Sequence, residues 1–280
     1  MKLSNNHDLF LSELLDYYSQ KYTSFKEYQT TVVETLDFFH AVCVKYDIPY
    51  YLAYGSLLGA IRDGGQIPWD YDIDVHVPYS YALKLISALQ QEVSDKYHFT
   101  TRFCDKKNRT YTLKLSPVKY DCEVFHVDVF WLFGMDDKFF DSNKQKIEKY
   151  TRLLCYKFLD FKYLMSSTRK SEKIACWVYK IKSSLYSTRI IDRYFEKVFS
   201  KNIADGDYLT DNACEVLFKK EWFNNRFLFK ISNDKEFYIP SNYDAILKKI
   251  YGDYSVNPPI ENRVNEFIRS INRLEKLSRL

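Results

Sequence analysis

Two carboxylates on one face of an expected strand are the residues in this sequence best placed to do chemistry. Residues 71–77 alternate polar and apolar side chains, so the two-residue period of a β-strand puts Asp72 and Asp74 on the same face. Neighbouring carboxylates repel each other, and a divalent cation removes that repulsion. Mg²⁺ takes oxygen ligands from one or two carboxylates together with substrate phosphates. The pair predicts a Mg²⁺ (or Mn²⁺) site, although an isolated Asp-x-Asp pair also suits the solvated face of an edge strand.

A Gly-Ser pair just before these carboxylates offers a place for an anion. The chain has 7 glycines, and four of them fall within residues 55–65. Glycine permits tight turns and a close approach of the backbone to a ligand. A strand at 48–54, then Gly55 and Ser56, then a short helix at 57–62 would direct backbone N–H groups and a hydroxyl toward phosphate. A phosphate cradle followed by a carboxylate pair is the outline of a nucleotidyltransferase-like site.

The run GSLLGAIRDGGQIPWDYDIDV at 55–75 resembles the signature of the LicD family, which includes bacterial phosphocholine transferases and the fukutin-related proteins. The segment IPSNYDAILKKIYGDYSVNPP at 239–259 is similar to the closing element of that family. The resemblance implies a nucleotidyltransferase-like fold with a third Asp on a later strand. It also implies that the closing element borders the donor site, with Tyr251 and Asp253 close by. Tyr71 replaces an acid that is frequent in the family.

Asp128 is the candidate for the third carboxylate. It lies between two valines in an expected strand at 123–132, where a charge is costly unless it is paired or bound to a metal. We interpret it as a metal ligand or a proton acceptor beside Asp72 and Asp74, with a structural ion pair as the alternative. His126 would share its face, but a lone histidine is more often structural, so we leave it out of the catalytic set.

Three further side chains are candidates for binding the donor. Arg62 ends the short helix, where its planar guanidinium could grip a diphosphate through two hydrogen bonds. Lys114 falls within an expected strand at 111–115, at a position where related sequences often carry a base. A surface ion pair is the alternative for each. Trp69 could pack the turn before the carboxylates, or stack on a base or on a choline headgroup.

The elements around these residues predict an α+β fold, a nucleotidyltransferase-like mixed sheet with packed helices. Apolar residues at helical spacing mark helices at 24–46 and 79–93. We expect a catalytic core at 1–135 and a basic, largely helical region at 136–280 that contains the closing element. Residues 135–235 carry no motif that we can place.

The charge of the chain is unevenly spread. Its formal net charge is +4, yet residues 144–201 hold fifteen Lys and Arg against five acids. This segment predicts contact with anionic lipid or with a phosphorylated glycan carrier, and a solvated helical face is the alternative. No apolar run is long enough to span a membrane, no leader is evident, and the 6 cysteines are scattered. We therefore expect reduced thiols, no zinc site, and a cytoplasmic protein that works at the inner face of the membrane.

These features together predict a Mg²⁺-dependent phosphotransferase of the LicD type. The resemblance implies a CDP-alcohol donor, with CDP-choline favoured, and a glycan or lipid-linked glycan acceptor in lipopolysaccharide, teichoic acid or capsule biosynthesis. Ribitol or glycerol phosphate is the alternative group. The alternatives from other classes are a glycan- or membrane-binding scaffold without activity, and a nucleotidyltransferase acting on nucleic acid. The IPWDYDID context argues against the nucleic-acid alternative.

Overall fold

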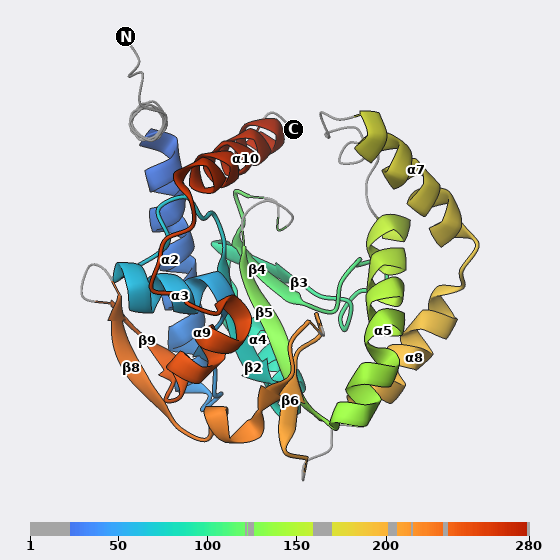
Figure 1. The fold of residues 1–280 in the computed structure, drawn as a ribbon, viewed down its shortest axis with the longest axis horizontal. Coiled ribbons are helices and arrows are strands. Elements are labelled where there is room, and N and C mark those ends of the chain that lie inside the picture. Colours follow the sequence, from blue (N-terminus) through green and yellow to red (C-terminus); the bar gives the residue numbers. More distant parts are fainter. Residues whose placement is uncertain are drawn as a thin grey trace.

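A mixed β-sheet with helices packed around it forms the centre of the molecule, as the computed structural model shows (Figure 1). The structure describes residues 23–120, 122, 126–158, 170–200, 206–213, 215–231 and 235–278. The α+β class predicted from the sequence is confirmed. Helices also dominate the region after residue 136, which additionally supplies four of the described strands.

The main sheet runs in the order β1-β2-β5-β4-β3. β2 and β5 are parallel, and the other neighbours in this path are antiparallel. Apolar side chains at alternate positions of β2 and β5 lie in the core on one face of the sheet. This alternation sets the register of the strands, because a shift by one residue would expose those side chains. The bounds of its strands are β1 Tyr51–Leu52, β2 Ile73–Pro78, β3 Tyr97–Thr100, β4 Leu113–Pro117 and β5 Val127–Met135.

Two shorter strand pairs follow in the C-terminal half. One strand, β6, pairs antiparallel with the end of β5 and with β7, so it extends the main sheet. The other pair forms a separate antiparallel hairpin that packs beside β1. Their bounds are β6 Tyr208–Thr210, β7 Phe218–Lys219, β8 Arg226–Ile231 and β9 Lys235–Pro240. The expected domain boundary at 135 stays a prediction.

Two helices pack beside the sheet in the N-terminal half. α2 (Thr23–Lys45) buries an apolar stripe at helical spacing, as the sequence predicts, and it contacts β4 and α4 (Ala82–Glu92). A short 3-10 turn, η1 (Tyr79–Tyr81), precedes α4, so the helix expected at 79–93 is divided into two parts. The expected strand at 123–132 is β5, which begins at Val127, and residues 123–125 lie outside the described part.

The segment before the carboxylates differs from the prediction. β1 is shorter than the strand expected at 48–54, and α3 (Tyr54–Asp63) begins earlier than the helix expected at 57–62. The chain turns from extended Ala53 straight into the helix at Tyr54, whose φ of 45° is positive. Gly55 and Ser56 therefore lie in the first turn of α3 and not in a loop before it. Gly64, at φ 69°, ends the helix in the left-handed conformation that glycine adopts without strain.

A second layer of helices covers the other end of β5. α5 (Asp137–Phe158) contacts both α7 (Lys170–Ser184) and α8 (Thr188–Ser200). Side chains from β5, α5 and α8 form a second core, separate from the core around α2 and β2. In Figure 1 these helices stand on the opposite side of the sheet from α2 and from α10 (Ile260–Ser278).

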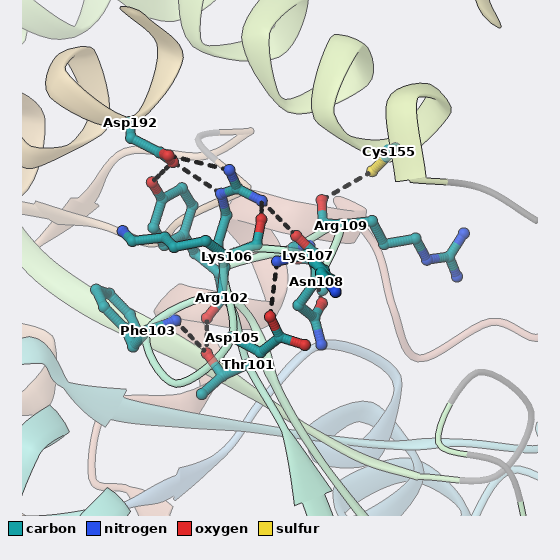
Figure 2. Close-up of polar contacts among 12 residues, drawn as sticks. Thr101, Arg102, Phe103, Asp105, Lys106, Lys107, Asn108, Arg109, Cys155 and Asp192 are labelled. Carbon is teal, nitrogen blue, oxygen red and sulfur yellow. Dashed lines mark hydrogen bonds and ion pairs between the residues drawn. The ribbon is translucent and has the colours of Figure 1, made fainter. Parts of the chain in front are cut away.

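A buried arginine ties this helical layer to the loop after β3. Figure 2 shows the Arg102 side chain reaching Asp192 of α8. Its Nε donates to Oδ1 at 2.7 Å, one Nη donates to Oδ2 at 3.0 Å, and Tyr111 donates its hydroxyl to the same carboxylate. The other terminal nitrogen of Arg102, Nη1, donates to the carbonyls of Lys106 and Asn108. Such a fully paired charge is one that a protein interior tolerates.

The C-terminal helices close the fold over α3 and α2. After the short turn η2 (Lys220–Phe223), α9 (Tyr243–Tyr251) contacts α3, and α10 (Ile260–Ser278) packs on α2 through Phe267 and Phe25, whose rings lie 5.1 Å apart. The closing element expected at 239–259 therefore lies beside the helix that carries Gly55 and Ser56. Among the described residues, none of the helices combines the length and apolarity needed to cross a bilayer.

Candidate functional site

Three charged side chains lie in register across the middle of the sheet. Asp74 in β2 pairs with Asp128 in the parallel strand β5, and Asp128 pairs with Lys114 in the antiparallel strand β4. Residues paired across strands project from the same face of a sheet. The sheet thus brings together three of the residues that the sequence marks as candidates, although they are far apart along the chain.

Asp128 is held between a lysine and a histidine. Lys114 Nζ lies 3.0 Å from one carboxylate oxygen, and His126 Nε2 lies 3.1 Å from the other. Lys114 Nζ is also 2.9 Å from His126 Nε2. Burial opposes ionisation of Asp128, but His126 and Lys114 together hold the pKa of its carboxyl well below the usual range. Asp128 is therefore an anion at neutral pH, and Lys114 forms a buried ion pair rather than the surface pair considered from sequence.

The three acids at 70, 72 and 74 crowd one another. Burial raises the pKa of Asp74 well above its usual value, and the negative charges of Asp72, Asp128 and Asp70 raise it further, while Lys114 lowers it. Burial and the charge of Asp72, with which it shares a hydrogen bond, likewise raise the pKa of Asp70. This excess of negative charge favours either bound protons or a bound cation. Sequence reasoning missed Asp70, because it precedes the alternating strand.

Asp72, His126 and Asp128 form a group of potential metal ligands. Each offers one ligand atom, and these atoms lie within 4.8 Å of one another. Nδ1 of His126 is buried and has no hydrogen-bond partner in the described part of the chain. Carboxylates suit Mg²⁺ and Mn²⁺, whereas an imidazole suits zinc, iron and other transition metals. The crowded acids and this donor set fit a divalent cation, with Asp74 alongside and His126 added to the ligands expected from sequence.

The Gly-Ser pair holds the carboxylate segment in place. Ser56 Oγ accepts a hydrogen bond from the backbone N–H of Asp74 at 2.8 Å, which links α3 to β2. A Cβ atom on Gly55 would lie only 2.8 Å from an oxygen of Asp70, so glycine allows this carboxylate to approach the helix. Because Ser56 accepts in this contact, its own O–H can still be donated. A role for Gly55 and Ser56 in binding phosphate therefore stays a proposal.

Arg62 and Trp69 lie together beside the last helix. The guanidinium of Arg62 makes two hydrogen bonds to Asp63, both at 2.8 Å, and lies 5.9 Å from the Trp69 ring. Arg263 of α10 lies 5.6 Å from the same ring, and Ser270 donates to the carbonyl of Trp69. Trp69 thus packs the turn against α10, which is one of the two alternatives. Donor phosphate would have to draw Arg62 away from Asp63.

Tyr251 brings the closing element within electrostatic reach of the carboxylates. It ends α9 and is 41% exposed. Partial burial and the charges of Asp74 and Asp70 raise its pKa, and Arg62 lowers it, so these groups all lie within electrostatic reach of its hydroxyl. Asp253 is exposed and accepts hydrogen bonds from Ser255.

A buried polar group that sequence reasoning missed lies further along the face of β2 that carries Asp74. Asp211 accepts hydrogen bonds from the Tyr54 hydroxyl and, at 3.0 Å, contacts His76 Nε2. His76 and Asp211 are both 1% exposed. His76 follows Asp74 on the same face of β2, a signal visible in the alternation. Asp211 lies in the stretch without motifs, so only the fold reveals this contact.

Comparison with known proteins gives two kinds of similarity. The sequence model of the LicD/FKTN/FKRP nucleotidyltransferase domain matches residues 47–162. The lipopolysaccharide cholinephosphotransferase LicD of Haemophilus influenzae is 28% identical over 266 residues, which cover 87% of this chain and 96% of that protein. An uncharacterized protein of Rickettsia typhi, RT0683, is 28% identical over 100 residues, covering 36% of this chain and 28% of that protein.

Proposed function

Because this chain belongs to the LicD family, we propose that it transfers phosphocholine from CDP-choline to a hydroxyl of a glycan or glycolipid precursor. The observation that carries the proposal is the register of Asp74, Asp128 and Lys114 within the matched domain, with Asp72 and His126 beside them. The Haemophilus relative, named a lipopolysaccharide cholinephosphotransferase, supports both the choline phosphate and the glycan acceptor.

The cation in this proposal is Mg²⁺ or Mn²⁺, held by Asp72, Asp74 and Asp128 with His126. When bound, it supplies positive charge that neutralises the donor diphosphate. Lys114 would keep Asp128 anionic and oriented toward this site through the ion pair at 3.0 Å. Holding the ligands in one geometry before the donor arrives is the main contribution that this part of the chain can make.

The transfer itself is a displacement at phosphorus. The oxygen of the acceptor hydroxyl forms a bond to the phosphorus that carries choline, the bond from that phosphorus to the bridging oxygen breaks, and CMP leaves with the electron pair. Such reactions need positioning and charge neutralisation more than covalent help from the protein. Ser56 and Arg62 are the residues that we propose for contacts with the donor phosphates.

Of the two roles considered for Asp128, the surroundings support the metal ligand. A general base works best when its pKa lies near the working pH. The pKa of Asp128 is instead held well below its usual range by His126 and Lys114. A carboxylate that stays anionic is better suited to binding a cation than to accepting a proton. The proton of the acceptor hydroxyl would then leave to solvent.

The proposal is tested by incubating the full chain with CDP-choline, CDP-ribitol or CDP-glycerol, each with Mg²⁺ and an acceptor glycan, and measuring CMP. We expect CMP release with CDP-choline, and none after chelation of the metal. Preferential release of CMP from CDP-ribitol or CDP-glycerol would show that ribitol phosphate or glycerol phosphate, and not phosphocholine, is the transferred group. A folded protein that releases no CMP from any donor would favour the inactive scaffold.

A further inference from the structure

The outward face of α7 is apolar. Large apolar side chains recur at helical spacing along α7 and just after it, and all of them are substantially exposed: Ile174 64%, Trp177 43%, Val178 42%, Ile181 59% and Leu185 80%. At 100° per residue these positions fall on one side of the helix. We call this set the α7 face. A continuous apolar surface of this kind on a protein marks a site of interaction.

The opposite side of α7 is the side that meets the rest of the protein. Ser183 is buried, and Lys180 donates to the carbonyl of Lys157 in α5. Lys157 in turn donates to the carbonyls of Ser183 and Tyr186. Polar contacts and the stacked rings of Tyr156 and Tyr179 thus dock α7 onto α5, while the side chains of the α7 face are exposed. This reverses the usual arrangement, in which the apolar stripe of a surface helix faces the core.

Cationic side chains border the α7 face. A groove of about 560 Å³ runs between α5 and α7, and its lining includes Lys149, Arg152, Lys182 and Leu185 together with Glu148, which pairs with Arg152. Leu185 belongs to both surfaces, so the apolar face and the cationic groove adjoin. Lys149 and Arg152 also lie over the rings of Tyr186 and Tyr179, at 5.2 and 5.5 Å. The groove therefore combines positive charge with amphipathic aromatic rings.

The charge distinguishes between two occupants of the α7 face. A second copy of this chain would bring two segments of residues 144–201, each with fifteen cations and five acids, toward each other, and like charges repel. An anionic bilayer offers the complementary charge in its headgroups and an apolar interior for the exposed side chains. Helices with an apolar face rich in Trp and aliphatic residues and a basic border lie in this way at the membrane interface.

We propose that the α7 face binds the surface of an anionic lipid bilayer, with its apolar side chains entering the acyl boundary and the cations of the adjoining groove contacting lipid phosphates. This goes beyond charge attraction by the segment as a whole, because it names the side chains that insert. It holds whether or not the chain transfers phosphocholine, because vesicle binding requires no catalysis.

The test is flotation of the full chain with vesicles of phosphatidylcholine alone, or of phosphatidylcholine mixed with phosphatidylglycerol. We expect binding to the mixed vesicles and a blue shift of tryptophan emission, and we expect Trp177→Phe to remove most of that shift. The double substitution Ile174→Gln with Ile181→Gln should weaken partition onto the mixed vesicles by about tenfold. This loss corresponds to a modest part of the free energy gained when two such side chains are buried. Lys149→Glu with Lys182→Glu should also weaken binding to the mixed vesicles, and this loss should be larger in low salt than in high salt.

Matched controls lie on α4, where Leu83 is 80% exposed and Lys84 is its exposed neighbour. Leu83→Gln with Lys84→Glu should leave vesicle binding unchanged. The proposal is overturned if the wild type fails to bind mixed vesicles, if it binds both kinds of vesicle equally, or if the α4 controls lose as much binding as the α7 variants. It is also overturned if lipid-free sedimentation shows a dimer that the α7 variants dissociate, because a second copy would then cover the face.

Discussion

Tyr54 donates a hydrogen bond to Asp211, which lies 157 residues further along the chain. Tyr54 is also one of the described non-glycine residues with positive φ. Two residues later, Ser56 accepts the backbone N–H of Asp74. A residue of the C-terminal half of the chain thus fixes the first turn of α3. Through Ser56, that first turn also fixes β2, the strand that carries Asp74.

Removal of the Tyr54 hydroxyl tests this link. Tyr54→Phe keeps the ring contacts with His76 and Phe130 but removes a hydrogen bond to a buried carboxylate. We expect a loss of about 1.5–3 kcal/mol in the free energy of unfolding, measured in urea. Tyr51→Phe is the control, because the Tyr51 hydroxyl donates to a neutral carbonyl, that of Phe223. An equal or smaller loss in Tyr54→Phe than in the control would contradict a special role for Asp211.

Asp74→Asn should change stability in the direction opposite to most core substitutions. Because the pKa of Asp74 is raised on folding, its charge opposes folding above the ordinary pKa of aspartate, and this cost grows as pH rises. Without metal at neutral pH, we expect the variant to melt at the same temperature as the wild type or higher. Added Mg²⁺ should raise the melting temperature of the wild type more than that of the variant. A variant that melts lower without metal would show that Asp74 stabilises the fold.

Asp128→Asn should have the opposite effect on stability. This substitution leaves Lys114 buried without its anionic partner, and breaking such a pair costs about 3–5 kcal/mol. Activity per folded molecule should also fall, on the order of a hundredfold or more, because a metal ligand is lost. Melting curves and CMP release measured on the same samples separate the two effects. Full activity per folded molecule would restrict Asp128 to a structural ion pair.

The contacts of Asp192 predict that the helical layer of α5, α7 and α8 is less stable in acid than at neutral pH. Burial disfavours its charge, yet hydrogen bonds from Arg102 and Tyr111 lower its pKa below the ordinary value. A depressed pKa contributes stability above the ordinary value of about 3.9, and this contribution disappears as pH falls through the lower, folded-state pKa. The wild type should therefore be more stable than Asp192→Asn at neutral pH, and the difference should shrink below about pH 4. A difference that is constant with pH would exclude the ion pair with Arg102 as its source.

Local patterns in the sequence predict much of this site. The alternation around Asp74 predicts β2 and its polar face, and the apolar run around Asp128 predicts β5. The closing element at 239–259 was expected near the donor site from resemblance, and α9 does contact α3. These features depend on a few consecutive residues, so a single sequence reveals them.

The remaining features depend on contacts between distant segments. No local pattern links Tyr54 to Asp211 or His126 to Lys114. The start of α3 at Tyr54 was missed because positive φ at a tyrosine is unfavourable in isolation and requires tertiary contacts. Likewise, the periodicity of α7 gives an apolar stripe, but only the packing on α5 shows that this stripe faces outward.

Turnover of the two strand-face carboxylate variants tests the central claim most directly. Asp72→Asn and Asp74→Asn each remove an anionic metal ligand while leaving the size of the side chain unchanged. With CDP-choline, Mg²⁺ and acceptor glycan, we predict that both variants stay folded by thermal melting and release no CMP above background, while the wild type turns over. Near-wild-type CMP release by either variant would contradict the account of Asp72, Asp74 and Asp128 as the metal-holding centre of a phosphotransferase.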